Sequence, residues 1–344
     1  MNGVPTPLST REVGVLGYLL RRTGGYAVMT AVATSVAYLA AVTFLRPESR
    51  LLQTSPRPTE EDVRVRLAGY GLDPAASALE RYRQWLEGVL LHWDWGRSPN
   101  GSPIAAEFLD RAAVSGRLLL LATVLQIVLG VALGVYSAVR QRRPADRAIT
   151  WLSYLLACVP APVVYLWVQM AGIFGNAGAG RRIVYVSGMS SPVPPEGVWA
   201  RIADDAAHLL LPTLALTLVG YGGYQLLQRA VLLDEVDSDY VRTARAKGLT
   251  RGQAIRRHAL RTSFVPVAQN VAFALPAVFA GSFVVEQVFA WEGLGTYTLE
   301  AVTRTQDVNA TVAAIAFGCA LFALGALLAD ASVGLLDPRV RGRA

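Results

Sequence analysis

Long apolar stretches separated by polar segments run through most of the 344-residue chain. A helix needs about 20 predominantly apolar residues to cross the hydrocarbon core of a bilayer. Six stretches are long enough, and they cover residues 24–45, 117–139, 149–174, 207–228, 263–285 and 310–333. The pattern therefore predicts an all-α membrane protein with six transmembrane helices. Pro160 and Pro162 fall inside the third stretch, where we expect them to kink the helix.

The composition agrees with this class, since 53% of the residues are hydrophobic and only 17% are charged. The two cysteines, Cys158 and Cys319, each fall within a predicted span. We interpret them as small apolar side chains in helix packing, and we predict neither a disulfide nor a metal site.

Basic residues concentrate in particular connections between the spans, and this distribution predicts the orientation of the chain. The connection between the fourth and fifth spans, residues 229–262, holds eight of them: Arg229, Arg242, Arg245, Lys247, Arg251, Arg256, Arg257 and Arg261. Both terminal segments, 1–23 and 334–344, are also basic, whereas the connection after the fifth span is mostly acidic. We therefore expect both termini and the 229–262 loop in the cytoplasm. The net charge of +7 is then a topology signal, and no nucleic-acid partner is needed to explain it.

Residues 46–116 form the longest predicted extracytoplasmic segment. Apolar residues recur at helical spacing over 75–91, and Trp85, Trp93 and Trp95 favour packing or a membrane interface. We expect a helical cap here, over the outer mouth of a pore formed by the core, residues 117–333.

The polar stretch 234–261 has the pattern of two short helices joined at a glycine. Tyr240, Ala244 and Gly248 recur every four residues, which predicts a common face of small and apolar groups. Gly248 suits a left-handed helix stop, and Thr250 with Gln253 has capping-box spacing for the next helix. Such a unit is either a rigid docking knob for a partner protein or a solvated basic loop.

Several polar and aromatic residues within or beside the spans are candidates for a transport pathway. A side chain of this kind either lines a pore or makes hydrogen bonds between helices, and the sequence leaves both uses open. The candidates are Gln126, Gln169, Tyr221, Tyr224, Gln225, Gln269 and Asn270. Glu286, just after the fifth span, either attracts the amino terminus of a peptide or braces a loop.

Enzymatic and ion-coupled alternatives lack their expected motifs. There is no Gly-x-x-x-x-Gly-Lys-Ser/Thr phosphate loop and no His-Glu-x-x-His zinc motif, and His208 and His258 have no serine–acid partner pattern. A secondary transporter usually carries an ionisable residue at mid-membrane, and none of the six spans has one near its centre. We therefore predict no catalytic residue and no enzymatic activity.

Four separated motifs resemble one protein family. They are DYVRTARAKGL with RHALR in the 229–262 loop, DWGRS at 94–98, VVEQVFAWEGLG at 284–295, and LDPRVR near the end of the chain. They resemble permease subunits of ATP-binding-cassette importers, specifically the B-type permease of the dipeptide, oligopeptide and nickel branch. The consensus Glu-Ala-Ala of the loop is replaced here by Arg242-Thr243-Ala244.

The resemblance implies a six-helix type I importer fold in a bacterial cytoplasmic membrane. It implies a second homologous permease subunit, two ATP-binding subunits or domains, an extracytoplasmic peptide-binding protein and surrounding lipids as partners. ATP and Mg would bind to the ATPase partners, and this chain would hold no cofactor. Nickel or glutathione import is the alternative within the same family.

The resemblance also assigns residues. The coupling helix that docks on the ATPase would comprise Asp239, Tyr240, Arg242, Thr243, Ala244, Arg245, Lys247 and Gly248. The segment 284–295, with Glu286, Phe289 and Trp291, would form a non-helical re-entrant element near the outer gate.

Overall fold

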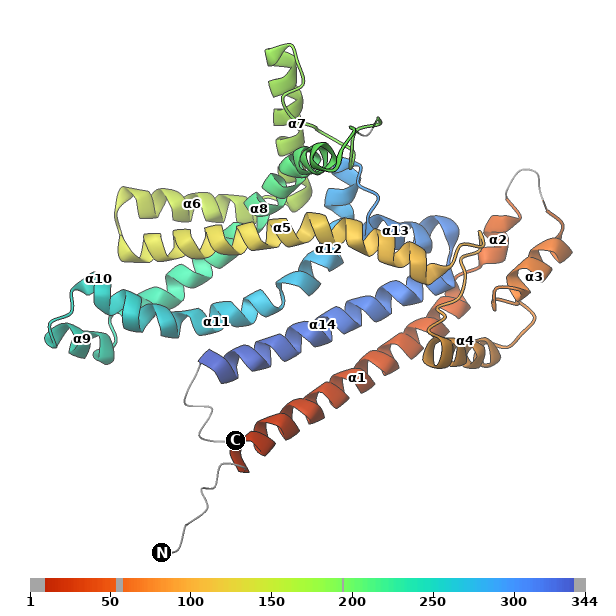
Figure 1. Cartoon of the computed structure of the whole chain (residues 1–344), viewed down its shortest axis with the longest axis horizontal. Helices are drawn as coiled ribbons and strands as arrows, with labels where there is room; N and C mark the ends of the chain where they lie inside the picture. Colours follow the sequence, from red (N-terminus) through yellow and green to blue (C-terminus); the bar gives the residue numbers. More distant parts are fainter. Residues whose placement is uncertain (1–9, 54–57, 194, 337–344) are drawn as a thin grey trace, which may run out of the picture.

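The computed structural model describes residues 10–53, 58–193 and 195–336, and within these ranges the regular elements are helices (Figure 1). The four long ones are α1 (Thr10–Phe44), α5 (Ile104–Val139), α8 (Val198–Val236) and α14 (Val308–Leu336). The shorter α-helices are α2 (Pro47–Leu51), α3 (Glu60–Ala68), α4 (Ala78–His92), α6 (Pro144–Cys158), α7 (Ala161–Ala179), α9 (Asp239–Ala246), α10 (Arg251–Ala254), α11 (Leu260–Ala272), α12 (Ala274–Phe289) and α13 (Leu294–Glu300), and two π-helical segments, η1 (Ile255–Ala259) and η2 (Ala301–Thr305), join α10 to α11 and follow α13. An all-α fold is therefore confirmed for the described chain.

Four helical stretches are long and apolar enough to cross a membrane: Arg21–Phe44, Ile104–Val139, Val198–Val236 and Val308–Ser332. Helices α6 and α7 make a fifth if they are one span, and they meet at an angle of 108°. The bend falls at Val159 and Pro160, where the prolines predict a kink. The predicted span 263–285 is divided between α11 and α12, which meet at Phe273. Six spans thus stay a prediction.

Helices α5 and α8 form the centre of the molecule and approach each other closely. Gly130 and Gly134 lie one turn apart on α5, and both contact the backbone of α8. A Cβ on Gly130 would lie 2.5 Å from the carbonyl oxygen of Tyr221, and one on Gly134 would lie 2.8 Å from that of Gln225. Larger residues are therefore excluded at these positions, as in other membrane helix pairs with small residues four apart.

Helix α1 runs beside α14, and α4 packs against the C-terminal half of α1 (Figure 1). The contact is aromatic: the rings of Tyr38 on α1 and Trp85 on α4 stack with centroids 4.7 Å apart. The hydroxyls of Ser35 and Tyr82 lie 2.8 Å apart beside this stack. The helix that the apolar spacing predicts over 75–91 is thus present as α4, attached to α1.

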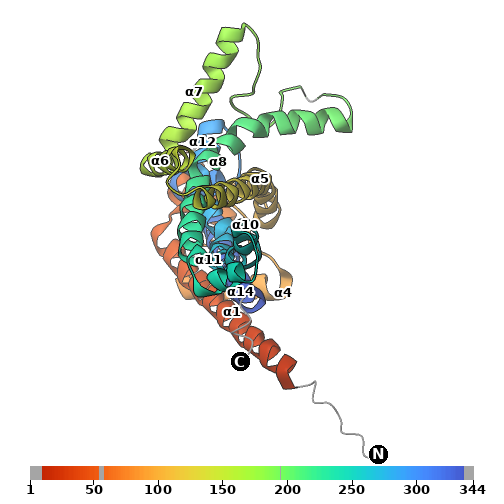
Figure 2. The same cartoon turned by 90° about the vertical axis from the view of Figure 1, so that its left-hand side faces the viewer.

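Figure 2 shows α7 and the first turns of α8 projecting from the rest of the molecule. The segment between them returns to the body at the end of α12. Gln169 Nε2 donates to the carbonyl oxygens of Val186 and Val288, at 3.1 and 2.6 Å, and Gly188 N donates to the carbonyl oxygen of Phe289 at 2.8 Å. Gln169 therefore holds the α7–α8 connection against α12.

Candidate functional site

The 229–262 loop folds as the predicted helix-glycine-helix. Helix α9 stops at Gly248, whose φ of +96° is the left-handed conformation that glycine adopts without strain. Its amide donates to the carbonyl oxygen of Arg245, and Leu249 N donates to that of Ala244. Thr250 and Gln253 then form a reciprocal capping box at the start of α10. The glycine stop and the capping box are confirmed.

The buried face of α9 differs from the one that the spacing predicts. Val241 and Ala244 are 1% and 7% exposed, and they pack with Leu232 of α8 and Ile255. Ala244 therefore contacts the chain's own helices, and the prediction that it shares a partner-facing side with Tyr240 and Gly248 is wrong. The reason is Val241: its larger apolar area favours turning the 241/244 side of the helix inward.

The outward side of α9 is polar and basic. Arg242 and Asp239 form an ion pair at 3.7 Å, and both side chains are largely in solvent, so the pair contributes little to stability. Tyr240 is also exposed, and its hydroxyl donates to the carboxylate of Glu235. The other predicted coupling residues that are exposed are Thr243, Arg245, Lys247 and Gly248. These groups form a surface that is free within the chain to contact another protein.

A buried ion pair lies behind this loop. Arg229 of α8 donates from Nε to Asp146 Oδ1 at 2.7 Å and from Nη2 to Oδ2 at 3.0 Å. The Asp146 carboxylate is only 2% exposed and also accepts the Arg142 amide at 2.8 Å. The pair fixes the α5–α6 turn to the cytoplasmic half of α8 predicted from charge. Sequence reasoning missed it, although one aspartate among the arginines of 140–147 was a usable signal.

The pathway candidates on α5 and α8 meet in the contact between these helices. Gln126 is 6% exposed and lies against Gly220, whose added Cβ would overlap its Oε1. Tyr221 and Gln225 are also buried there, and Gln225 Nε2 donates to Ser137 Oγ at 3.5 Å. Tyr224 lies half-buried beside Gly130. In the single chain these side chains fill an interhelical contact.

Gln269 and Asn270 lie elsewhere, exposed on α11. Asn270 Nδ2 donates to the carbonyl oxygen of Pro266 at 3.1 Å within its own helix. With Arg22 and Asp330, which form an ion pair at 2.6 Å, they border a small cavity of about 360 Å³. The structure therefore does not bring these two residues together with the α5–α8 group.

Glu286 braces the turn between α12 and α13. Its carboxylate is fully buried and accepts from Ser115 Oγ at 2.6 Å and from the Thr296 amide at 2.7 Å. Ser115 Oγ in turn accepts the Leu294 amide at 2.7 Å. The carboxylate thereby caps the first turn of α13, where helix N–H groups lack partners. Sequence reasoning left bracing open for Glu286 but missed Ser115, which carries no local motif.

The segment predicted to be non-helical over 284–295 is helical for two thirds of its length. Residues 284–289 belong to α12 and 294–295 to α13, and the chain leaves the helix only over 290–293, starting at Ala290, which has φ of 54°. Phe289 and Trp291 are buried at 0% and 4% in the apolar core with α5, α7 and α8. The prediction of a non-helical re-entrant element is therefore corrected to a short turn, because α12 continues as long as its apolar side chains pack in that core.

No group of three or more histidine, cysteine or acidic side chains within residues 10–53, 58–193 and 195–336 is arranged to hold a metal ion. His208 is 3% exposed, and its Nδ1 lies 2.8 Å from the carbonyl oxygen of Asp204. Its ring packs on Tyr185, with centroids 3.7 Å apart. This geometry positions His208 in helix packing.

Apolar helices of spanning length, a closely packed central pair and an exposed basic helix-glycine-helix together define a multi-pass membrane permease. The chain belongs to the family described as binding-protein-dependent transport system inner membrane components, which matches residues 130–342.

Curated relatives agree with this family. The chain is 36% identical over 324 residues to the oligopeptide transport system permease protein OppB of Mycobacterium bovis, covering 94% of this chain and 98% of that protein. It is 28% identical to the oligopeptide transport system permease protein AppB of Bacillus subtilis, covering 84% and 88%. It is 26% identical to the dipeptide transport system permease protein DppB of Escherichia coli, covering 95% and 99%. The resemblance to B-type permeases of peptide importers is confirmed.

Proposed function

We propose that this chain is the transmembrane permease subunit of an ATP-driven importer of oligopeptides or dipeptides. The observation that carries the proposal is the similarity to the mycobacterial oligopeptide permease over 94% of the chain. A binding protein outside the membrane would deliver the peptide. A second permease subunit would complete the pathway, and two ATP-binding subunits or domains would bind ATP and Mg and drive the cycle.

The exposed side of α9 supports a docking role for the 229–262 loop. Arg242, Arg245 and Lys247 point away from the apolar cluster that holds α9, so they are available to acidic groups of an ATPase. Such charges favour association and orientation of a partner. The coupling surface proposed here excludes Ala244 and keeps the other seven predicted residues.

Movement of α9 would reach the membrane helices through two contacts. Val241 and Ala244 pack against α8, and the Arg229–Asp146 pair joins α8 to the turn before α6. Because α8 also packs tightly on α5, these helices form one rigid unit. A displacement of the docked loop would then move α5 and α8 together.

At the predicted outer end, the Glu286 brace supports a gate that moves as a block. Ser115 belongs to α5, Glu286 to α12 and Thr296 to α13, so their hydrogen bonds join three helices. Arg111 adds a link from α5 to Glu292 of the turn, at 3.0 Å. In this proposal, cargo would meet other surfaces, and Glu286 would fix the shape of the turn.

The test is uptake by proteoliposomes that contain the complete assembly purified from the native membrane with its binding protein. A radiolabelled tetrapeptide should accumulate inside the proteoliposomes only when ATP and Mg are present on the side of the membrane that carries the ATPase subunits. Accumulation of nickel or glutathione instead of peptide would show that the importer carries one of these alternative substrates of the family. Uptake driven by a proton or sodium gradient without ATP would overturn the importer proposal.

A further inference from the structure

The turn between α5 and α6 carries a concentrated positive charge outside the proposed coupling surface. Four exposed arginines lie within eight residues and are called the arginine turn: Arg140, Arg142, Arg143 and Arg147. None of them forms an ion pair with an acidic side chain of the described residues. The one acidic residue in the turn, Asp146, is buried and pairs with Arg229 of α8. The charge of the four arginines is therefore unbalanced within the chain.

The backbone of the arginine turn is fixed, so its charges are held in one place. Asp146 Oδ2 accepts the Arg142 amide at 2.8 Å, and Arg142 has a left-handed φ of 65°. The amides of Arg143 and Arg147 donate to the carbonyl oxygens of Arg140 and Arg143, both at 3.1 Å. Helix α6 begins in this turn without a side-chain N-cap, and its N-terminal dipole adds to the positive potential. The turn is thus preorganised for an anion.

Exposed aromatic and apolar side chains continue from this turn along one side of α6. Trp151, Tyr154 and Leu155 follow Arg147 at helical spacing, and they are 69%, 58% and 45% exposed. At 1.5 Å per residue, Trp151 lies about 6 Å and Leu155 about 12 Å from Arg147 along the helix. The headgroup layer on each side of a bilayer is about 5–7 Å thick. Arg147, Trp151 and Leu155 therefore match the depths of the headgroups, the interface and the acyl chains.

The two basic surfaces at this end of the molecule differ in what adjoins them. Figure 1 shows the α5–α6 turn at the same end as α9 and α10, the end predicted to face the cytoplasm. Helix α9 buries its apolar residues Val241 and Ala244, whereas α6 exposes an aromatic and apolar stripe next to its arginines. Arginines that adjoin exposed apolar helix suit the boundary of a membrane. The surface of α9 suits a soluble partner.

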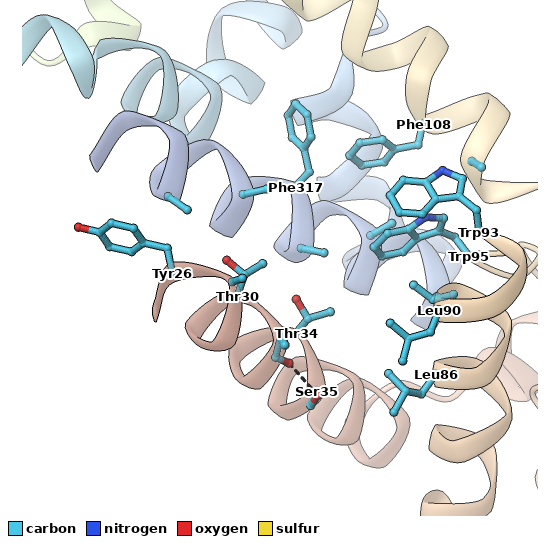
Figure 3. A pocket seen from close by; sticks show the side chains of 18 of the residues that line it. Tyr26, Thr30, Thr34, Ser35, Leu86, Leu90, Trp93, Trp95, Phe108 and Phe317 are labelled. Atoms are coloured by element: carbon cyan, nitrogen blue, oxygen red, sulfur yellow. Dashed lines mark hydrogen bonds between the residues drawn. The ribbon is translucent and has the colours of Figure 1, made fainter. Parts of the chain in front are cut away.

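Apolar surface without such charge exists elsewhere in the described chain. A cavity of about 660 Å³ lies between α1, α4, α5 and α14, and Figure 3 shows Tyr26, Trp95 and Phe108 among the side chains that line it. No charged side chain of the described residues lines this cavity. It offers no means of choosing between an anionic and a neutral lipid, whereas the arginine turn does.

We propose that the arginine turn binds the headgroup of an anionic phospholipid in the cytoplasmic leaflet, with Trp151 at the level of its glycerol and an acyl chain along α6. Basic residues beside a membrane helix attract anionic headgroups, and arginine makes paired hydrogen bonds to phosphate oxygens. The guanidinium of Arg140 lies over the ring of Tyr136, 4.5 Å from its centroid. The phosphate contacts are therefore assigned to the other three arginines.

The bound lipid would steady the path from the coupling loop into the membrane, a consequence that rests on the proposed importer function. The Asp146–Arg229 pair joins the arginine turn to α8, and Val241 of α9 packs against α8 from the other side of that path. A headgroup that holds the turn at the membrane surface would hold the near end of α8 with it. Lipid binding itself does not depend on what the chain transports.

The test compares two photoreactive lipids in the assembly extracted from its native membrane and returned to bilayers. Phosphatidylglycerol and phosphatidylcholine carry the same diazirine acyl chain, so their labelling differs only through the headgroup. Mass spectrometry of the cleaved chain gives the labelling of residues 148–158 by each lipid. In the wild type, phosphatidylglycerol should label this segment at least fivefold more than phosphatidylcholine at equal amounts, because three arginines favour its net negative headgroup.

Two triple variants separate the arginine turn from net charge. Arg142→Gln with Arg143→Gln and Arg147→Gln removes three charges from the turn and keeps its backbone hydrogen bonds. The matched control removes three exposed arginines in other parts of the chain: Arg66→Gln, Arg83→Gln and Arg181→Gln. The control should keep the wild-type preference, and the turn variant should be labelled equally by the two lipids. Equal labelling in the wild type, or an unchanged preference in the turn variant, would overturn the proposal.

Two further measurements separate the lipid from other anionic partners. Inorganic phosphate added at fixed ionic strength should leave the preference unchanged, and loss of the preference would reveal a site for free phosphate instead. The ATP-binding subunits should co-purify equally with the turn variant and the control. Their loss from the turn variant alone, with the lipid preference kept, would assign these arginines to the ATPase. Because labelling is read without ATP, it tests the lipid site even if the importer proposal fails.

Discussion

Arg229 of α8 and Asp146 at the start of α6 are 83 positions apart in sequence and form a two-pronged ion pair, with N–O distances of 2.7 and 3.0 Å. The aspartate is almost fully enclosed, whereas the arginine is 24% exposed. Pairs of this kind contribute little net stability but are costly to break, since the remaining charge loses its partner.

Replacing Asp146 with Asn should therefore destabilise the chain by about 2–5 kcal/mol, toward the lower end because Arg229 reaches solvent. The double variant Asp146→Asn with Arg229→Gln should recover part of this loss. Thermal unfolding of both variants and of Arg229→Gln alone gives the coupling between the two positions. Additive losses would show that the pair has no structural role.

Glu286→Gln should destabilise the turn between α12 and α13 by about 1–3 kcal/mol. Every neighbour of the carboxylate donates a hydrogen bond, and an amide offers its NH₂ group to one of those donors. Ser115→Ala should act in the same direction, because it leaves the Leu294 amide unpaired. Thermal unfolding measures the loss, and the KM of uptake separates bracing from cargo contact. A raised KM with unchanged stability would favour cargo contact.

Gly248→Trp should abolish uptake while the chain still inserts and folds. The left-handed φ makes any Cβ strained by about 1–2 kcal/mol, but the space around Gly248 is open. Gly180 is a matched control, since it also has positive φ and open space and lies in the α7–α8 connection. Gly180→Trp should cost similar stability and leave ATPase association intact. Equal loss of association in both variants would contradict docking at Gly248.

Charge reversal at Arg242 and Arg245 should weaken co-purification of the ATP-binding subunits at least tenfold at low salt, and the difference from the wild type should shrink as salt rises. Both side chains are exposed, so the fold should tolerate the change. The control reverses Arg83 and Arg181, two exposed arginines outside the loop. Co-purification that is equal in the two double variants would count against the proposed coupling surface.

Asp307 makes stability depend on pH. Burial raises the pKa of this carboxyl, with a smaller contribution from Glu107, despite hydrogen bonds from Ala310 and Ser98. The pKa of Asp307 is therefore higher in the folded chain than in the unfolded chain, where it is about 3.9. The contribution of the protonated carboxyl to folding stability is complete below about pH 3.9, and it is lost as the pH rises through the folded pKa. Asp307→Asn should therefore be more stable than the wild type at pH 8, with this advantage shrinking toward pH 4. If the difference in melting temperature between Asp307→Asn and the wild type were the same at pH 8 and at pH 4, the titration of Asp307 would be disproved.

The sequence predicted the elements that depend on local chemistry. Apolar length indicated the long helices, Pro160 marked the bend between α6 and α7, and Gly248 with Thr250 set the ends of α9 and α10. These features need no knowledge of which segments meet.

Contacts between distant segments were not predictable in the same way. Ala244 was placed on the wrong side of α9 because the inward turn depends on Leu232 and Ile255, which lie in other elements. Ser115 pairs with a residue 171 positions away, and no spacing rule connects the two. The division of 263–285 into α11 and α12, by contrast, has a local signal: Pro276 in the first turn of α12 cannot donate to the carbonyl of Ala272, where α11 ends.

The glycines of α5 also set an order for biogenesis. The side of α5 at Gly130 and Gly134 packs directly on the backbone of α8. The helices α6 and α7 lie between α5 and α8 in the sequence, so they are synthesised before α8 is complete. At about 5–20 residues per second, α5 spends several seconds in the membrane beside lipid rather than its final neighbour. The sharply bent α6–α7 pair must therefore leave that side of α5 open until α8 arrives, so assembly of the centre waits for a helix inserted late.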